Sequence, residues 1–147
     1  MRLPVEALEA TVLLADVSKP ATTVGAGRHV LVVDDDADVR RTVGRSLQVM
    51  GYRVDVLASR ELASERLERT AFHAAVVDVQ MPGPRLPAFL RELGTRCPRL
   101  PILLMSGDPS SELTPELRAQ SPAPMGFIAK PFNPAQLTAA VHALTEA

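Results

Sequence analysis

Two short apolar runs in this sequence end directly in carboxylates. The run HVLVV (29–33) precedes Asp34, Asp35 and Asp36, and the run AAVV (74–77) precedes Asp78. Apolar runs this short, bounded by turn-forming residues, are typical of strands that are covered on both faces. In open α/β folds, ligands bind at the edge formed by the carboxyl ends of such strands. We therefore predict two buried strands that bring carboxylates to one edge of a parallel sheet.

These carboxylates predict a magnesium site suited to phosphate chemistry. Mg²⁺ typically takes one or two carboxylates together with phosphate oxygens, and a bound cation removes the repulsion between adjacent acids. Ser106 and Lys130, each expected at the end of a further strand, offer a hydroxyl and an ammonium group to phosphoryl oxygens. Phosphoryl transfer depends mainly on positioning and charge neutralisation, and a carboxylate such as Asp78 is a candidate nucleophile.

Each of these residues also has a plainer interpretation. The acids at 34–36 could cap a helix, Asp78 and Ser106 could be turn residues, and Lys130 could be a solvated surface charge. Lys130 is one of two lysines among 16 basic residues, which indicates either a need for a compact charge or codon bias. Their joint placement at predicted strand ends favours a functional site over these separate explanations.

The elements that must position these residues follow from hydrophobic spacing. Apolar runs predict strands at 29–34, 52–57, 73–78, 100–106 and 125–129. Helices are predicted at 36–50 and 60–69, from Pro87, and after Asn133, which caps the fifth helix. Between the fourth and fifth strands, DP (108–109) and TP (114–115) permit at most a short fourth helix. We expect the second helix to bury Leu62, Ala63 and Leu67. This α/β alternation implies right-handed crossovers, hence a parallel sheet with helices on both faces.

Composition narrows the class of protein. The chain has 147 residues and a net charge of −1, which predicts one domain with no electrostatic attraction to nucleic acid or membranes. No apolar run approaches the roughly 20 residues that cross a bilayer, and the N-terminus lacks the pattern of a signal peptide. Cys97 is alone, which excludes an internal disulfide. We expect a cytoplasmic protein.

Residues 1–28 differ in pattern from the rest of the chain. Residues 5–17 carry a mild apolar pattern that fits a short helix or a strand, and residues 18–27 have the composition of a linker. We expect residues 1–28 to be a loosely held extension, with a docking or dimerisation arm as the alternative. The domain itself is expected at 29–147.

Over residues 29–146 the chain resembles the receiver domain of response regulators in bacterial two-component signalling. The motifs that carry the resemblance are VVDDD (32–36), VVDVQMPG (76–83), MSG (105–107) and GFIAKPF (126–132). The resemblance implies a flavodoxin-like, doubly wound, five-stranded parallel sheet in the order 2-1-3-4-5 with five helices. It also implies a magnesium-dependent phosphorylation switch that catalyses only its own phosphorylation and dephosphorylation.

The resemblance implies a role for each matching acid. Asp78 would accept a phosphoryl group from the phosphohistidine of a sensor histidine kinase or a phosphotransfer protein. Mg²⁺ would be held by Asp34, Asp35 and Asp78 together with the main-chain carbonyl of Gln80. The signal would pass to an unknown downstream protein, without direct binding to nucleic acid and without membrane insertion.

The resemblance also assigns the residues around the phosphoryl group. Ser106 would hydrogen-bond that group, and Phe127 would turn inward as Ser106 moves, so that the two form the switch. Lys130 would contact the phosphoryl oxygens, aimed by a cis peptide bond to Pro131. Plain core packing is the competing interpretation of Phe127.

Some positions depart from the family pattern. Residues 85–87 (RLP) stand where the family usually has an Asp-Gly pair, which affects the loop and the start of the third helix. The short fourth helix lies on a face that many relatives use for dimerisation or output. Asp108 and Gln80 occupy variable positions beside the site, and we expect Asp108 to influence the lifetime of the acyl phosphate.

Two other classes of protein share parts of this pattern. The first is a non-phosphorylated interaction module that keeps the receiver fold as a scaffold. The second is a small hydrolase of the phosphoaspartate type, which would need a second acid close to its nucleophile, and VQ at 79–80 offers none. As a receiver, the chain would be either a free-standing regulator or a segment of a hybrid kinase.

Overall fold

The computed structural model describes residues 24–82 and 85–146. Within these residues, five strands and five helices alternate. The strands are β2 (His29–Val33), β3 (Arg53–Leu57), β4 (Ala74–Asp78), β5 (Ile102–Ser106) and β6 (Met125–Ala129). The helices are α1 (Ala37–Val49), α2 (Arg60–Leu67), α3 (Leu86–Arg96), α4 (Pro115–Arg118) and α5 (Pro134–Thr145). Every element predicted from residue 29 onward is present, although four of the five strands are one or two residues shorter than expected.

All five strands pair in parallel, in the order β3-β2-β4-β5-β6. Numbered along the chain, this is the expected order 2-1-3-4-5, so the predicted fold class is confirmed. The three central strands are buried along their whole length, whereas β3 at the edge consists of exposed and half-buried residues. The carboxyl ends of all five strands therefore lie at one edge of the sheet.

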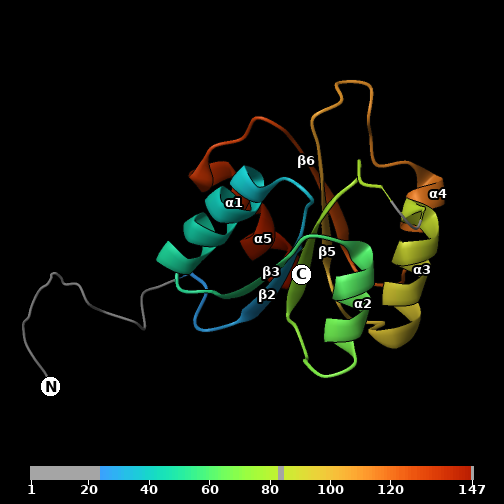
Figure 1. The fold of residues 1–147 in the computed structure, drawn as a ribbon, viewed down its shortest axis with the longest axis horizontal. Helices are drawn as coiled ribbons and strands as arrows, with labels where there is room; N and C mark the ends of the chain where they lie inside the picture. Colours follow the sequence, from blue (N-terminus) through green and yellow to red (C-terminus); the bar gives the residue numbers. More distant parts are fainter. Residues whose placement is uncertain (1–23, 83–84, 147) are drawn as a thin grey trace, which may run out of the picture.

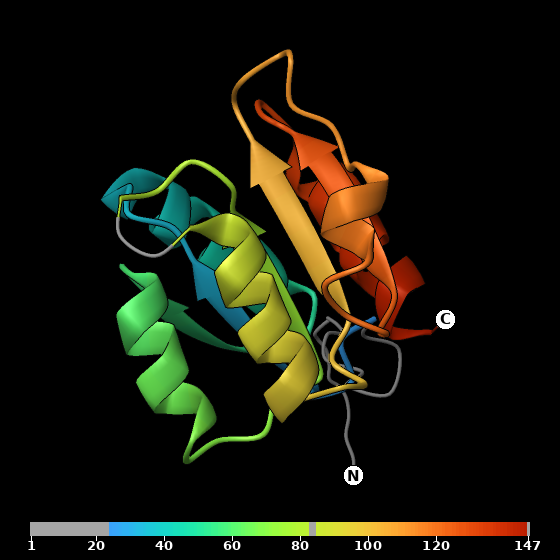
Figure 2. The same ribbon diagram turned by 90° about the vertical axis from the view of Figure 1, so that its right-hand side faces the viewer.

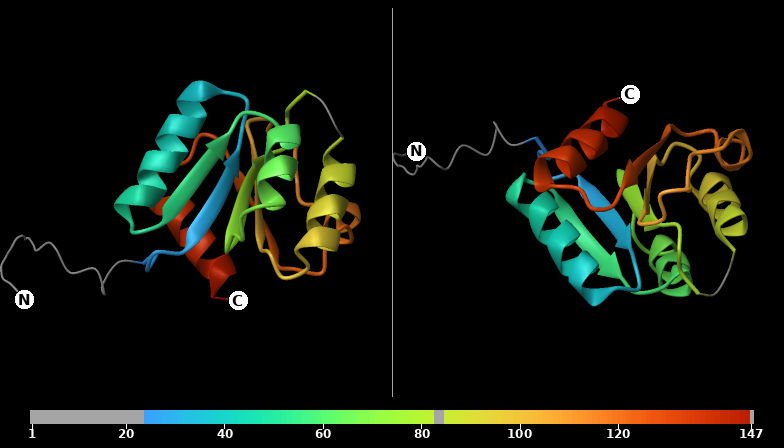
Figure 3. Two further views of the ribbon diagram at one scale, coloured as in Figure 1. Left: turned by 60° about the horizontal axis from the view of Figure 1, so that its bottom comes forward. Right: turned by 90° about the horizontal axis from the view of Figure 1, so that it is seen from above.

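Helices cover both faces of the sheet, as Figures 1 and 3 show. On one face, α1 and α5 pack against a core that includes Val32, Val76 and Leu103. On the other face, α2 and α3 pack against a core that includes Val33 and Val77, and α4 adds Leu117 at its margin. Figure 2 looks onto this second face, with α2, α3 and α4 in front of the strands. Alternate residues of each buried strand thus supply two separate cores.

Capping residues explain where the helices begin. Asp36, Ser59 and Thr114 accept hydrogen bonds from main-chain amides in the first turns of α1, α2 and α4. Asn133 and Gln136 form the predicted capping box of α5. Helix α3 begins one residue earlier than expected, at Leu86, with Pro87 in its first turn. Helix α4 has only four residues, in agreement with the prediction of a short fourth helix.

The predicted buried face of the second helix was partly wrong. Ala63 is fully buried and Leu67 packs at the margin of the core, but Leu62 is 45% exposed. Arg60 is buried in its place, with only 2% of its surface exposed. Helix α2 is eight residues long, and so short a segment leaves its inward face poorly determined by hydrophobic spacing alone.

The structure describes only the end of the expected N-terminal extension. Residues 1–23 lie outside the described residues. Residues 24–28 are held against the turn after α1, where Gly25 N–H donates to Met50 O at 2.8 Å and Gly27 N–H donates to Gly51 O at 2.8 Å. Arg28 also forms an ion pair with Glu146 beyond α5.

Candidate functional site

The structure brings the predicted acids together at the carboxyl edge of the sheet. Asp34 directly follows β2, and Asp78 is the last residue of β4; both are buried, at 0% and 3% exposure. Asp35 follows Asp34 and is exposed. One carboxylate oxygen from each of these three residues lies within 4.8 Å of the other two. Two neighbouring strand ends thus build a cluster of three carboxylates.

Lys130 lies between the two buried acids. Its ammonium Nζ is 3.0 Å from Asp34 Oδ2 and 3.5 Å from Asp78 Oδ1. The residue directly follows β6, and its main-chain N–H donates to Ser106 O at 2.7 Å, which ties the ends of β5 and β6 together. The peptide bond to Pro131 is cis, as the resemblance implies. The predicted lysine therefore contacts the predicted phosphoacceptor.

The pKa values of Asp78 and Lys130 are both raised, for different reasons. Burial raises the pKa of Asp78, and the nearby charge of Asp34 raises it further; a hydrogen bond from Gln80 N–H and the charge of Lys130 oppose the rise. Burial lowers the pKa of Lys130, but its contacts with Asp34 and Asp78 outweigh burial, and the net pKa is raised. The cluster thus carries more negative charge than one ammonium group compensates.

The donor atoms of the cluster fit a hard divalent cation. Carboxylate oxygens are the ligands that Mg²⁺ prefers, and three of them already converge in the structure. Asp34 Oδ1 accepts the N–H of Asp36 at 2.9 Å, which fixes the orientation of that carboxylate. Gln80 lies in the loop after β4, where its N–H donates to Asp78 Oδ1 at 3.3 Å. The carbonyl of Gln80 as a fourth ligand stays a prediction.

Ser106 is at the adjacent strand end, but its hydroxyl faces the loop after β5. The residue is 1% exposed, and its Oγ donates to Ser111 Oγ at 2.8 Å and accepts the N–H of Asp108 at 3.0 Å. Ser111 was not among the predicted site residues, since a serine in a polar loop carries no distinctive signal. The hydroxyl is therefore held by a neighbouring serine rather than by the acids.

The carboxylate of Asp108 is engaged within its own loop. It accepts hydrogen bonds from Ser110 N–H at 2.9 Å and from Ser110 Oγ at 2.8 Å. These bonds lower the pKa of Asp108. The expected influence of Asp108 on an acyl phosphate stays a prediction.

Phe127 lies within β6, opposite Leu104 in the parallel register. It is half-buried and packs at the margin of the core beneath α2 and α3. The structure thus shows the packing contact, and a switching role for this ring stays a prediction.

Arg60 is a site residue that the sequence analysis missed. From the start of α2 it reaches the end of β4, where Nη2 donates to Asp78 O at 3.3 Å and to Val79 O at 3.2 Å. Its guanidinium Cζ lies 6.0 Å from the centre of the Phe89 ring, within reach of a cation–π contact. Burial lowers its pKa, while the charges of Asp78, Glu61 and Asp35 raise it. A second buried cation therefore contacts the main chain at Asp78 and Val79, next to the acid cluster.

Comparisons with known proteins agree with this geometry. The model of the family described as "Response regulator receiver domain" matches residues 30–142. The sensor kinase CckA of Brucella abortus (strain 2308) is 34% identical over 128 residues, which are 86% of this chain and 13% of the kinase. The chain thus spans a small part of that relative.

Solved structures show the same fold. The chemotaxis response regulator CheY4 of Vibrio cholerae is similar with a TM-score of 0.72 and 28% identity, covering 80% of this chain and 98% of that chain. The BeF3-activated DrrB receiver domain gives a TM-score of 0.70 and 26% identity, covering 82% of this chain and 99% of that chain.

Among the described residues, no helix is both long and apolar enough to cross a bilayer.

Proposed function

Because the chain belongs to the response regulator receiver domain family, we propose that it is a phosphorylation-dependent signalling switch whose phosphoacceptor is Asp78. Receiver domains interact with histidine kinases or phosphotransfer proteins, and a phosphohistidine of such a partner is the proposed donor. An Asp78 carboxylate oxygen attacks the phosphorus, the P–N bond breaks with its electrons left on the imidazole, and the P–O bond of an acyl phosphate forms.

The contact between Lys130 and Asp78 is the observation that carries the proposal. Its ammonium lies 3.5 Å from the attacking carboxylate and 3.0 Å from Asp34. A phosphoryl group bound to Asp78 would place new oxygens next to that ammonium, which contacts two carboxylates in the present structure. Phosphoryl transfer is promoted chiefly by such fixed positive charge.

The acid cluster supports magnesium as the cofactor. Asp34, Asp35, Asp78 and the main-chain carbonyl of Gln80 would hold the ion, whose charge would offset the charge of the phosphoryl oxygens. Asp34 then orients the site through its bonds to Asp36 N–H and Lys130, and Asp78 supplies the reacting oxygen.

Ser106 and Phe127 are the proposed switch. On phosphorylation, the Ser106 hydroxyl would leave Ser111 Oγ and donate to a phosphoryl oxygen, which draws in the loop after β5. Phe127, beside β5 in the sheet, would then turn further into the core.

We assign residues 29–147 to the receiver domain and residues 1–28 to an extension.

Intact-mass measurement with acetyl phosphate and Mg²⁺ tests the proposal. We expect the wild-type chain to gain one phosphoryl group and Asp78→Asn to gain none. Asp38→Asn is a matched control, because Asp38 is an exposed acid on α1 paired with Arg41 at 2.7 Å. Asp38→Asn should be labelled like the wild type. A wild-type chain that stays unlabelled would instead support the alternative, a non-phosphorylated scaffold with a receiver fold.

A further inference from the structure

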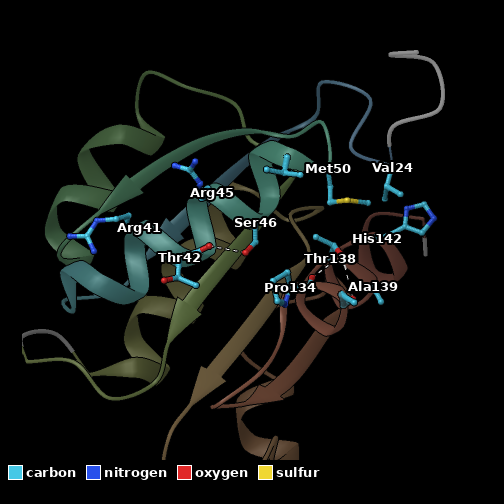
Figure 4. Close-up of a pocket in the computed structure, with 12 residues that line it drawn as sticks. Val24, Arg41, Thr42, Arg45, Ser46, Met50, Pro134, Thr138, Ala139 and His142 are labelled. Carbon is cyan, nitrogen blue, oxygen red and sulfur yellow. Dashed lines mark hydrogen bonds between the residues drawn. The ribbon is translucent and has the colours of Figure 1, made fainter. Parts of the chain in front are cut away.

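An apolar groove of about 780 Å³ lies between α1 and α5, apart from the acid cluster. Figure 4 shows Thr42 and Ser46 of α1 facing Pro134 and Thr138 of α5 across it. Val49, which also lines the groove, is 73% exposed, more than any other large apolar residue of the described chain. Exposed apolar surface of this kind commonly marks a site that another segment or chain covers.

The ionisable side chains that line the groove are all of basic residues. Arg41, Arg45 and His142 contribute to its lining, which contains no acid. Arg41 is paired with Asp38 at 2.7 Å, and Arg45 is exposed where it lines the groove. A segment that fits this groove therefore combines apolar residues with acids.

The chain itself enters the groove at one end. Val24, the first described residue, lines it together with Met50. The next residue is fixed there, because Gly25 N–H donates to Met50 O at 2.8 Å. A Cβ atom at Gly25 would lie 2.5 Å from Gly51 C, so that this close approach requires glycine. The described chain is thus anchored beside Met50, at the edge of the groove.

The sequence before Val24 combines apolar residues with acids, as a segment that fits the groove should. In residues 5–17, Val5, Leu8, Val12 and Ala15 recur at helical spacing. The charged residues of this segment are Glu6, Glu9 and Asp16, all acidic. A 13-residue helix is about 20 Å long, the same as α1 with its 13 residues. The six residues 18–23 span at most about 20 Å, enough for the segment to fold back along α1.

We propose that residues 5–17 bind in the α1–α5 groove as an amphipathic helix. Its apolar side covers Val49 and Met50, and its acids face Arg41 and Arg45. This intramolecular contact is distinct from the phosphorylation switch and does not depend on it. It would shield an apolar face from other chains.

Thiol labelling of a cysteine placed in the groove tests the proposal on the full, unphosphorylated chain. Ala139 is exposed and lines the groove, and Ala139→Cys changes its volume little. With residues 5–17 (the arm) unchanged, N-ethylmaleimide should modify this cysteine about tenfold more slowly than in the Leu8→Asp/Val12→Asp background. The reason is that a thiol covered nine-tenths of the time reacts only when it is uncovered. Native Cys97, at the end of α3, is the internal reference.

Two sets of variants make the outcome specific. Ala21→Asp/Thr22→Asp adds the same charge to the linker and should leave the protection in place. Arg45→Glu should weaken the protection, and Glu6→Arg/Glu9→Arg in that background should restore it. Equal labelling rates with the arm intact and with Leu8→Asp/Val12→Asp would overturn the proposal. Protection that grows with protein concentration would also overturn it, because a second copy would then occupy the groove.

Discussion

Two carboxylates of the same sheet, Asp55 and Asp78, have pKa values shifted in opposite directions. Burial raises the pKa of both. At Asp55, hydrogen bonds from His29 at 3.0 Å and Arg66 at 2.6 Å outweigh burial, and the net pKa is lowered. At Asp78 the neighbouring Asp34 adds to the effect of burial, and the net pKa is raised. Asp55 is therefore a stabilising ion-pair partner, whereas burial and the charge of Asp34 make the ionised carboxylate of Asp78 destabilising.

The ion pairs of Asp55 predict a measurable dependence of stability on pH. A carboxylate with a lowered folded-state pKa stabilises the protein above its unfolded pKa of about 3.9, and that stabilisation is lost as the pH falls through the folded value. Asp55→Asn should lower the free energy of unfolding at pH 7 by about 1 kcal/mol, since the pair is only partly buried. The difference from wild type should shrink as the pH falls below about 4. Urea unfolding at several pH values measures both effects.

Asp38→Asn is the control for this experiment. Asp38 also pairs with an arginine, at 2.7 Å, but the two side chains are 85% and 69% exposed. Solvent screening leaves such a pair with roughly 0–0.5 kcal/mol of stabilisation. Equal losses in the two variants would show that the buried position of Asp55 adds nothing.

At the scale of elements, the sequence predicts strands and helix starts better than it predicts inward faces. Apolar runs such as 29–33 predicted the three buried strands correctly because both faces of those strands are covered. Ser59 and Asn133 predicted helix starts correctly because capping depends only on neighbouring residues. The acid cluster was also predicted, because the carboxyl ends of parallel strands lie at one edge of the sheet. Arg60 could not be found this way, since its partners are main-chain carbonyls, which every residue possesses, at the end of a different strand.

Arg60 ties α2 to the end of β4, and we expect this tie to position the magnesium ligands. Arg60→Met removes the donor to Asp78 O and Val79 O, which should cost about 1–3 kcal/mol of stability. Loss of the tie should weaken Mg²⁺ binding and slow labelling by acetyl phosphate. Loss of a positive charge alone would instead strengthen Mg²⁺ binding. Calorimetric titration with Mg²⁺ separates the two effects by their sign.

Two further variants complete that comparison. Arg60→Lys keeps the charge and one donor, and it should recover part of the Mg²⁺ affinity. Arg66→Met removes an arginine from the same helix, where it pairs with Asp55 and not with the loop after β4, and should leave the affinity unchanged. Tighter Mg²⁺ binding in Arg60→Met would contradict the positioning role.

For the whole molecule, the proposed Mg²⁺ site would link folding stability to the ion. Without the ion, Asp78→Asn relieves the repulsion from Asp34 and the burial of a charge, while Lys130 keeps its contact with Asp34 at 3.0 Å. The variant should then be about 1 kcal/mol more stable than wild type. With Mg²⁺ at 100 times its dissociation constant, the wild type should gain about 2.7 kcal/mol, whereas the variant has lost one carboxylate ligand and should gain less.

The order of the two melting temperatures should therefore reverse when Mg²⁺ is added. Thermal unfolding followed by circular dichroism, in EDTA and in Mg²⁺, measures this reversal, and NaCl at matched ionic strength separates binding from screening. A shift that NaCl reproduces, or an equal shift in both proteins, would show that Asp78 does not hold the ion. A reversal specific to Mg²⁺ would mean that the fold tolerates the unfavourable buried charge of Asp78 because Mg²⁺ compensates it. The carboxylate that destabilises the protein without the ion would then be one that binds the ion.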